Sequence, residues 1–476
     1  MITFMVSIVA LILGYFIYGK FVERTFGPSS NNVTPAISKE DGVDYKVLSP
    51  WKVYVIQFLN IAGLGPIFGA ILGAAYGPMA YIWIVLGCIF MGAAHDYFSG
   101  MLSIRNGGAN VPDIIGKYLG GGMKQFILVL SVCLLLVLSA SFVSGPADLL
   151  AELTSLDKQI WVCVVLGYYI LATLLPIDKL IGRFYPVFGA LLLFMVLSVG
   201  IVMLYKACSG DVKMIELSLS SFKNMHANPE TNILFPMMFI VISCGAISGF
   251  HSTQSPLMMR CMSDEKYGRP VLYGAMISEG IVAMIWATAA IAYMGGVEGL
   301  NEAAAAGKTP AILVNEICQS WLGKFGAILA ILGVIICPIT SGDTAARSCR
   351  LIVADKLKIR QKPIINRILI AIPIFIIISW LCMMQFAVIW QYVGIGNQIL
   401  ASIVLWTGAE YLRKHGKNHW IMSLPATFLT YICVCYIMIA PVNVGGIALN
   451  HTLSYVVAGV VALGFMLFFL LAKRAK

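Results

Sequence analysis

Four ionisable residues stand inside segments of this chain that are otherwise strongly apolar. His95 and Asp96 are adjacent in one apolar segment, His251 lies in a second and Glu279 in a third. Charged side chains are costly at membrane depth and often mark ion pathways or substrate sites. Proton relay is therefore one possible chemistry, and a buried, paired or hydrogen-bonded side chain is the structural alternative at each position.

A fourth segment, PITSGDTAARSCRL (338–351), combines hydroxyl groups with a carboxylate. Asp343 stands four residues before Arg347, so a local helical ion pair is its structural explanation. The functional explanation is a coupling-ion region at the inner end of a membrane helix. The residues predicted for coupling are Thr340, Ser341, Asp343 and Thr344, with Asp96, Glu279 and His95 as secondary candidates.

The composition identifies the elements that must position these residues. The chain has 476 residues, of which 59% are hydrophobic and 11% charged, and its mean hydropathy is +0.88. Repeated apolar runs of about 18 or more residues predict an all-α polytopic membrane protein. The net charge of +10 is interpreted as a topology signal, so no nucleic acid partner is expected.

The hydropathy pattern predicts about thirteen transmembrane helices. A more polar stretch at 303–322 predicts an interfacial or re-entrant helix. The predicted spans are 2–22, 51–73, 78–102, 123–146, 159–176, 184–206, 233–259, 271–297, 324–346, 365–384, 387–411, 419–441 and 451–472.

The basic residues orient these spans. With the N-terminus outside and the C-terminus cytoplasmic, 26 of the 32 Lys and Arg residues fall in segments predicted to be cytoplasmic. Such a bias predicts a multi-pass protein of the cytoplasmic (inner) membrane. The twelve cysteines are scattered through apolar segments, so no metal, disulfide or cofactor is predicted.

Two of the predicted spans contain helix-breaking residues at membrane depth. They read NIAGLGPIFGA (60–70) and SCGAISGFHSTQSP (243–256), and they lie five spans apart, so their helices cross in opposite directions. Small residues for close helix packing are the alternative explanation. Matching breaks in inverted halves are typical of LeuT-type transporters, whose unwound segments bind substrate and ions. The predicted substrate-binding residues are Asn60, Ala62, Gly63, Gly65, Pro66, Gly245, Ser248, Gly249 and His251.

This pattern divides the chain into a 5+5 inverted repeat with additions at both ends. In each repeat the first helix is the broken one. The predicted units are an extra N-terminal helix and loop (1–50), the first repeat (51–206), the second repeat with the interfacial helix (207–411) and two C-terminal helices (412–476).

Several long stretches resemble the carbon starvation protein A (CstA) family of peptide and pyruvate transporters. They are DGVDYKVLSPWKVY (41–54), FLNIAGLGPIFGAILGAAYGP (58–78), GAAHDYFSGMLSIRNGG (92–108), CGAISGFHSTQSP (244–256) and PITSGDTAARSCRLIVAD (338–355). The resemblance implies an importer induced when carbon is scarce. His95-Asp96 departs from the Gln-Asp of the long family members, which leaves coupling and substrate open.

The sequence thus predicts a secondary transporter for short peptides or pyruvate, driven by H⁺ or by Na⁺. Its expected partners are that small molecule, the ion and the lipid bilayer, and its oligomeric state is open. No HExxH, GxSxG or Walker pattern is present, so an enzyme is not predicted. A starvation sensor that binds ligand without transport and a passive channel are the alternatives.

Overall fold

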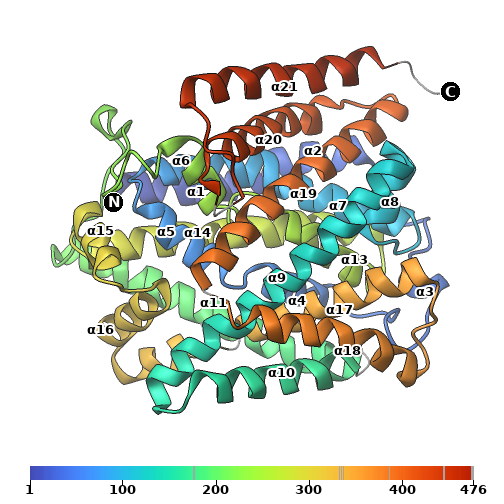
Figure 1. Ribbon diagram of the computed structural model, residues 1–476, viewed down its shortest axis with the longest axis horizontal. Helices are drawn as coiled ribbons and strands as arrows, with labels where there is room; N and C mark the ends of the chain where they lie inside the picture. Colours follow the sequence, from blue (N-terminus) through green and yellow to red (C-terminus); the bar gives the residue numbers. More distant parts are fainter. Residues whose placement is uncertain are drawn as a thin grey trace.

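The computed structural model consists of helices joined by turns and loops. It describes residues 1–174, 177–331, 333, 335, 337–384, 386–442 and 445–472, and within these no strand occurs. The predicted all-α class is confirmed for this part of the chain. The long helices α10 (Lys158–Leu174), α18 (Ile364–Leu381) and α21 (His451–Leu471) run along the long axis of the molecule (Figure 1).

The first half of the chain supplies the helices that enclose the site from one side. Two of its segments, η1 and η2, are short π-helical stretches. In chain order the elements are α1 (Ile2–Phe16), α2 (Tyr18–Phe26), α3 (Pro35–Ser38), α4 (Pro50–Ile61), η1 (Gly65–Gly69), α5 (Ala70–Ala74), α6 (Met79–Gly87), η2 (Cys88–Gly92), α7 (Ala93–Arg105), α8 (Val111–Leu119), α9 (Gly121–Thr154) and α11 (Ile177–Ser209).

The second half encloses the site from the other side and ends in a peripheral helical hairpin. That hairpin is formed by α20 and α21, and it packs on the core through α19. The elements are η3 (Leu219–Ser221), η4 (Leu234–Met238), α12 (Phe239–Val241), α13 (Gly249–Met259), η5 (Glu265–Tyr267), η6 (Arg269–Tyr273), α14 (Gly274–Tyr293), α15 (Val297–Ala305), α16 (Pro310–Ile331), α17 (Cys337–Leu357), α19 (Phe386–Lys414) and α20 (Trp420–Ile439).

Eight helices of the described residues are long and apolar enough to cross a membrane, or up to nine if one bent pair counts as a single span. The predicted number of thirteen is therefore not confirmed, although helices occur at all the predicted span positions. α13 and α17 are short or polar for a span, but nearly all of their side chains are buried. A helix that contacts protein instead of lipid does not need an apolar surface.

The first predicted break is confirmed. α4 ends at Ile61, residues 62–64 are non-helical, and the chain continues into η1 and α5 at an angle of 52° to α4. Pro66 occupies the first turn of η1, where its missing N–H group removes no helical hydrogen bond. The proline therefore starts the second half-helix instead of disrupting one.

The second predicted break is confirmed as well, and it contacts the first. Residues 242–248 separate α12 from α13 and are non-helical. A Cβ added to Gly65 would lie 2.2 Å from the Cβ of Cys244, and Gly245 adopts a φ of +91° beside Pro66. Glycine is required at both positions, because a side chain would fill the space in which the two unwound segments meet.

One predicted boundary is wrong. The span predicted for 324–346 ends eleven residues too early, because α17 continues to Leu357. The residues assigned to a cytoplasmic loop include Arg347 and Arg350, which are fully buried and lie 3.7 and 3.9 Å from the carboxylate of Asp44. This pairing lets the helix carry charges where the hydropathy pattern indicates a loop. Its predicted start is supported by Gly323, whose backbone (φ +64°) kinks α16.

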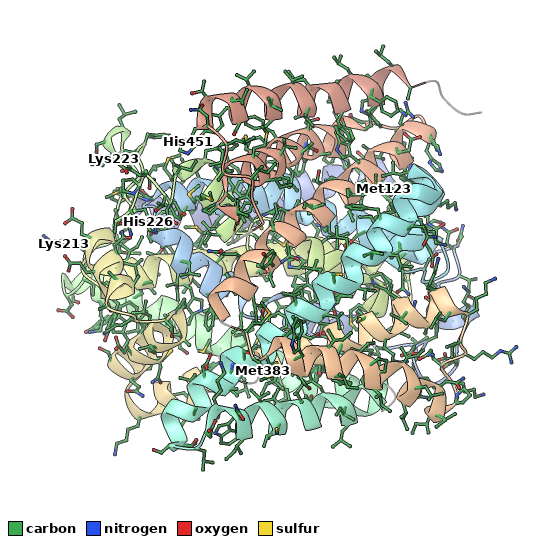
Figure 2. The ribbon with its side chains drawn as sticks, viewed as in Figure 1. Met123, Lys213, Lys223, His226, Met383 and His451 are labelled. Atoms are coloured by element: carbon green, nitrogen blue, oxygen red, sulfur yellow. The ribbon has the colours of Figure 1, made fainter. Side chains whose placement is uncertain are left out.

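The N-terminus, which is predicted to lie outside, contacts the loop that follows α11. Glu216 accepts hydrogen bonds from the backbone N–H groups of Ile2 and Thr3, at 2.9 and 2.8 Å. Partial burial opposes ionisation, but these bonds and the N-terminal ammonium lower the pKa of Glu216 to about 2. Lys213 and Lys223 lie at this same end (Figure 2). The orientation of this side in the cell, and of the basic residues 473–476 outside the described chain, stays a prediction.

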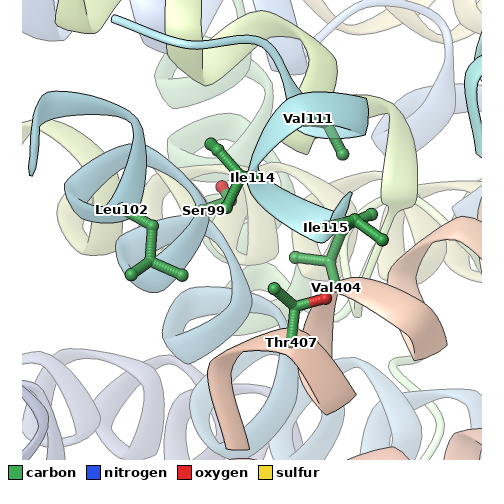
Figure 3. A pocket seen from close by; sticks show the side chains of 7 residues that line it. All are labelled: Ser99, Leu102, Val111, Ile114, Ile115, Val404 and Thr407. Carbon is green, nitrogen blue, oxygen red and sulfur yellow. The ribbon is translucent and has the colours of Figure 1, made fainter. Parts of the chain in front are cut away.

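The interior between α7, α8 and α19 is closely packed. It contains one small cavity of about 10 Å³, roughly the volume that holds a single water molecule (Figure 3). The cavity is lined by Ser99, Leu102, Val111, Ile114, Ile115, Val404 and Thr407. A space of this size does not admit a peptide or a small carboxylic acid, so this region serves as packing.

The contact between the broken helices can be tested at Gly69. A Cβ added there would lie 2.9 Å from the backbone oxygen of Val241, which cannot rotate away. We expect Gly69→Ala to destabilise the protein by about 1–3 kcal/mol, the usual cost of overpacking. Thermal unfolding of the purified protein in detergent measures this as a melting temperature several degrees lower.

The matched control is Gly464→Ala on the peripheral helix α21, where an added Cβ meets nothing within 4 Å. Alanine is the better helix former there, so this variant should melt at or above the wild-type temperature. Equal melting temperatures for the two variants would contradict the close approach of the broken helices.

Candidate functional site

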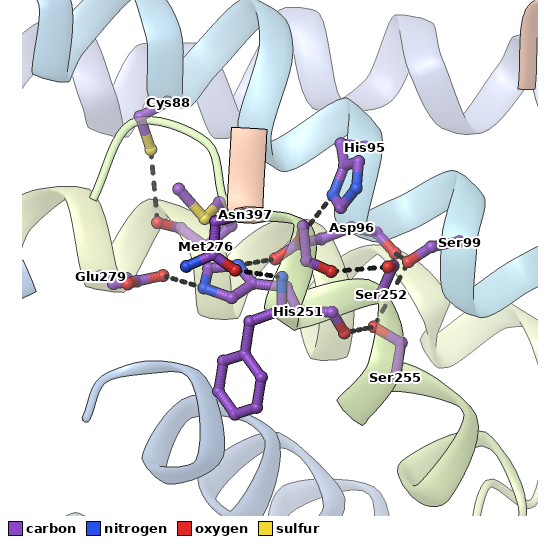
Figure 4. A network of polar contacts seen from close by, with 12 residues as sticks. Cys88, His95, Asp96, Ser99, His251, Ser252, Ser255, Met276, Glu279 and Asn397 are labelled. Carbon is purple, nitrogen blue, oxygen red and sulfur yellow. Dashed lines mark hydrogen bonds and ion pairs between the residues drawn. The ribbon is translucent and has the colours of Figure 1, made fainter. Parts of the chain in front are cut away.

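The structure brings three of the apolar segments together at one buried point. The Nδ1 atoms of His95 and His251 lie 2.8 and 2.9 Å from the two carboxylate oxygens of Asp96 (Figure 4). The other ring nitrogen of His251, Nε2, lies 3.4 Å from the carboxylate of Glu279. All four side chains are fully buried. We call this group the His–Asp–His–Glu network.

Its members come from α7, from the half-helix α13 and from α14. α7 can approach the second break because Gly92 at its start has no side chain. A Cβ there would lie 2.2 Å from the backbone oxygen of Ala246. The hydroxyl of Ser99, one turn after Asp96, donates to the Asp96 backbone oxygen and lies 3.4 Å from the Ser255 hydroxyl of α13.

The electrostatics of the network are unequal at its two ends. Asp96 accepts from two imidazoles, so its negative charge has two hydrogen-bond donors. Glu279 faces a single imidazole nitrogen, His251 Nε2 at 3.4 Å, and neither group makes a hydrogen bond of normal geometry at this end among the described residues. Unpaired polar atoms in a buried site are costly unless a proton, an ion or a ligand compensates them. The Glu279 end is therefore the chemically open end.

The predicted substrate residues of the first break are all buried around the end of α4. The backbone oxygen of Ala62 accepts from Cys337 Sγ at 2.8 Å, and a Cβ on Gly63 would lie 2.9 Å from Ser341 Oγ. The side-chain amide of Asn60 has no hydrogen-bond partner among the described residues. The same holds for Gln57, one turn earlier on α4, which sequence reasoning missed.

The predicted residues of the second break lie against α19. The Phe250 backbone N–H donates to Asn397 Oδ1 at 3.0 Å, and a Cβ on Gly249 would lie 2.3 Å from the Asn397 backbone oxygen. Asn397 thus caps the N-terminal end of α13. Sequence reasoning missed this residue, because an Asn in the middle of a distant apolar span gives no local signal. Ser248 Oγ is buried without a hydrogen-bond partner among the described residues.

The predicted coupling residues of α17 form a second polar centre. Ser341 Oγ donates to the Leu59 backbone oxygen of the broken helix at 3.1 Å. The hydroxyls of Thr340 and Thr344 turn back onto their own helix, to the Cys337 and Ser341 carbonyls at 2.8 and 2.9 Å. Of the three hydroxyls, only that of Ser341 makes the predicted contact with the first broken helix.

Asp343 has a partner that the sequence did not indicate. The Tyr185 hydroxyl of α11 donates to Asp343 Oδ2 at 2.6 Å, while Oδ1 has no hydrogen-bond partner among the described residues. Arg347, the predicted helical partner, lies beside Asp44 and donates to the Ala172 backbone oxygen at 2.6 Å. Asp343 is fully buried, it accepts a hydrogen bond from the neutral Tyr185 hydroxyl, and the guanidinium groups of Arg347 and Arg350 also act on it electrostatically.

One group of side chains has donor atoms suitable for a metal ion. The group consists of Cys244, His251 and Glu279, which are all buried. Each residue offers one ligand atom, and the three ligand atoms lie within 4.8 Å of one another. The sequence spacing gave no metal motif, because Cys244 and His251 are on either side of a helix break and Glu279 is on another helix. Only the fold brings the three together.

Comparison with known proteins supplies a family. The family model described as "Carbon starvation protein CstA" matches residues 1–145, 143–324 and 295–436. An "Uncharacterized membrane protein" of Haemophilus influenzae is 43% identical over 353 residues, covering 64% of this chain and 95% of that protein.

Other relatives have functional names. A "Peptide transporter CstA" of Bacillus subtilis is 24% identical over 590 residues, which cover 98% of this chain and 96% of that protein. A "Pyruvate/proton symporter BtsT" of Escherichia coli is 24% identical over 349 residues, which cover 60% of this chain and 48% of that protein.

A solved structure supports the predicted fold in coarse form. A nucleobase-cation-symport-1 family transporter, in a closed conformation with bromovinylhydantoin bound, has a TM-score of 0.50 to this chain at 13% identity. The match covers 88% of this chain and 91% of that protein. The likeness shows that this chain shares the overall helical fold of that protein, and it says nothing about the substrate.

The network around Asp96 makes a prediction for stability. We expect Asp96→Asn to lower the melting temperature, because hydrogen bonds to a charged group contribute about 1.5–3 kcal/mol each. The control is Asp113→Asn, whose carboxylate pairs with Lys124 at the surface, where a pair is worth about 0–1 kcal/mol. Thermal unfolding of both variants in detergent measures the difference.

A double-mutant cycle separates coupling from general damage. Because His251 and Asp96 share a buried hydrogen bond, His251→Gln and Asp96→Asn should be non-additive by about 0.5–3 kcal/mol. Effects that add within about 0.5 kcal/mol would contradict the network.

Proposed function

Because this chain belongs to the carbon starvation protein CstA family, we propose that it is a proton-coupled importer of a short peptide or of pyruvate in the cytoplasmic membrane. The names of two relatives and the likeness in fold to a transporter support a transporter over an enzyme. One named relative is a peptide transporter and another a pyruvate/proton symporter, at equal identity to this chain, so both substrates stand in the proposal. A role when carbon is scarce is part of it.

The observation that carries this proposal is the contact between two broken helices at a buried polar centre. Unwound backbone is tolerated at membrane depth where it lines a transport site or finds partners in the protein. Two such segments, around Ala62–Pro66 and Gly245–His251, meet beside ionisable side chains. A passive channel does not require this arrangement, and a sensor does not require both segments to move.

The repeat architecture belongs to the proposal. Residues 51–206 and 207–411 form the two inverted repeats, each opened by its broken helix, with 1–50 and 412–476 as additions. The unwound segments hold the substrate, with Asn60, Ser248 and His251 as its polar contacts. A carboxylate of pyruvate or of a peptide C-terminus would be held by backbone N–H groups at the start of η1.

We assign the coupling proton to Asp343. Asp96 lies within hydrogen-bond distance of two imidazoles, which stabilise its ionised form and make it a poorer proton carrier. Asp343 is buried with a tyrosine hydroxyl as its closest polar partner, and its second oxygen is available. Ser341, two residues earlier on α17, hydrogen-bonds the end of α4, so protonation of Asp343 would act next to the first break.

The first test is uptake into proteoliposomes of labelled pyruvate and a labelled dipeptide. A proton gradient and a sodium gradient are imposed separately. We expect one of the two substrates to accumulate above equilibrium with the proton gradient alone. Accumulation driven by the sodium gradient would contradict the proposal that the coupling ion is a proton. Uptake that stops at equilibration under both gradients would identify a facilitator or channel.

The second test replaces Asp343 by asparagine. Exchange of substrate across the membrane needs no net proton movement, whereas accumulation does. We therefore expect Asp343→Asn to abolish gradient-driven accumulation, by at least tenfold, and to retain substrate exchange. Asp148→Asn is the control, since its carboxylate pairs with Lys158 at the surface. If Asp343→Asn accumulates substrate as well as the wild type does, Asp343 does not carry the coupling proton. Asp96, Glu279 and His95 are then the next candidates.

A further inference from the structure

We propose that Cys244, His251 and Glu279 form a binding site for a divalent transition-metal ion of the zinc class, and that an ion bound there blocks transport. The three ligands come from three different pieces of the fold. Cys244 lies in the unwound segment 242–248, His251 lies on the half-helix α13, and Glu279 lies on α14.

The distances are close to those that a bound ion needs. Zinc binds sulfur, nitrogen and oxygen at about 2.0–2.3 Å, so ligand atoms in a tetrahedral site lie about 3.3–3.8 Å apart. The His251 Nε2 and Glu279 Oε2 atoms are 3.4 Å apart, and all three ligand atoms lie within 4.8 Å of one another. The widest pair therefore needs to approach by about 1 Å at most.

The atoms that face the site are only loosely paired. His251 Nε2 and the Glu279 carboxylate face each other at 3.4 Å without a hydrogen bond of normal geometry among the described residues, and both side chains are fully buried. A cation between them would satisfy these atoms in one step. It would also balance the carboxylate charge that Glu279 brings into the interior.

Asp96 supplies the support that metal-binding histidines usually have. Such a histidine donates its other ring N–H to a carboxylate, which fixes the tautomer and orients the ring. His251 Nδ1 lies 2.9 Å from Asp96 Oδ2, so in the metal-bound state Nδ1–H would donate to Asp96 and Nε2, which faces Glu279, would be the ligand atom. Asp96 is itself held by His95.

The donor set selects the class of metal. Magnesium and calcium prefer oxygen ligands, whereas a thiolate and an imidazole favour zinc and its neighbours. Three protein ligands leave a fourth tetrahedral position open for water or an anion. A surface cluster would exchange ions freely, but this site is buried and fills only when the protein opens.

The block of transport rests on the function proposed above. In that function the unwound segment 242–248 changes shape while α14 supports it. A metal ion that bonds Cys244 on this segment and Glu279 on α14 would hold the two at a fixed distance. The binding itself does not depend on any transport activity.

The binding test uses tag-free, full-length protein that has been stripped with a chelator and then equilibrated with Zn²⁺. We expect one ion per chain after gel filtration, and its loss in Cys244→Ser. Asp96→Asn should bind with affinity reduced about 10–100-fold, as expected for an outer carboxylate. Cys433→Ser, a buried cysteine on α20, is the control and should bind like wild type.

Cadmium gives a second readout that a misfolded variant cannot imitate. Cd²⁺ bound to a thiolate has a characteristic ultraviolet absorption band, which should appear in wild type and in Cys433→Ser and be absent in Cys244→Ser. Bound ion that is unaffected by Cys244→Ser, or wild-type protein that shows no thiolate band, would overturn the site. Equal metal-free melting temperatures of the two serine variants exclude misfolding as the cause.

The transport arm measures substrate exchange with and without Zn²⁺, each variant against its own zinc-free rate. We expect inhibition of at least tenfold in wild type and in Cys433→Ser, and none in Cys244→Ser. If zinc binds without slowing exchange, the proposed inhibition of transport is wrong, but the proposed binding site still stands. If wild type exchanges no substrate at all, the proposed function fails, and the binding result still decides the metal site.

Discussion

A bilayer interior offers no water to an unpaired backbone group, and this constraint governs the structure of the protein. α4 and the segment before α13 each interrupt their hydrogen-bond ladders at buried positions. The freed groups must find partners inside the protein or be left at a cost of several kcal/mol. The chain meets this demand by placing the two breaks against each other and against α17 and α19, whose side chains Cys337, Ser341 and Asn397 bond the exposed backbone.

The same constraint explains why the polar residues form two centres and not one. Around His251, buried carboxylates are matched with imidazoles. Around Asp343 the partner is a phenolic hydroxyl, which is neutral. The first centre matches carboxylates with imidazoles at hydrogen-bond distance and holds three helices together. In the second centre a phenolic hydroxyl makes the hydrogen bond, and the charges of Arg347 and Arg350 act on the carboxylate electrostatically.

Much of the fold followed from local patterns, since Gly and Pro at membrane depth identify a break wherever it occurs. The positions of both breaks, and of helices at every predicted span, could be predicted in this way. The partners of the site residues could not. Tyr185, Asn397 and Asp44 act on residues more than a hundred positions away, and a single sequence carries no signal for such contacts. The end of α17 was misplaced for the same reason, because burying Arg347 depends on a carboxylate in a distant loop.

The hairpin of α20 and α21 has an evolutionary consequence. It packs onto the core mainly through α19, and α21 is far less buried than the span that includes α14. The family model stops at residue 436, before α21 begins. Substitutions on an outward surface have few neighbours to disturb, so this layer tolerates changes of sequence more readily than the closely packed centre of the molecule. Functional differences among relatives should therefore be sought in the core helices, where a substitution affects the residues packed against it.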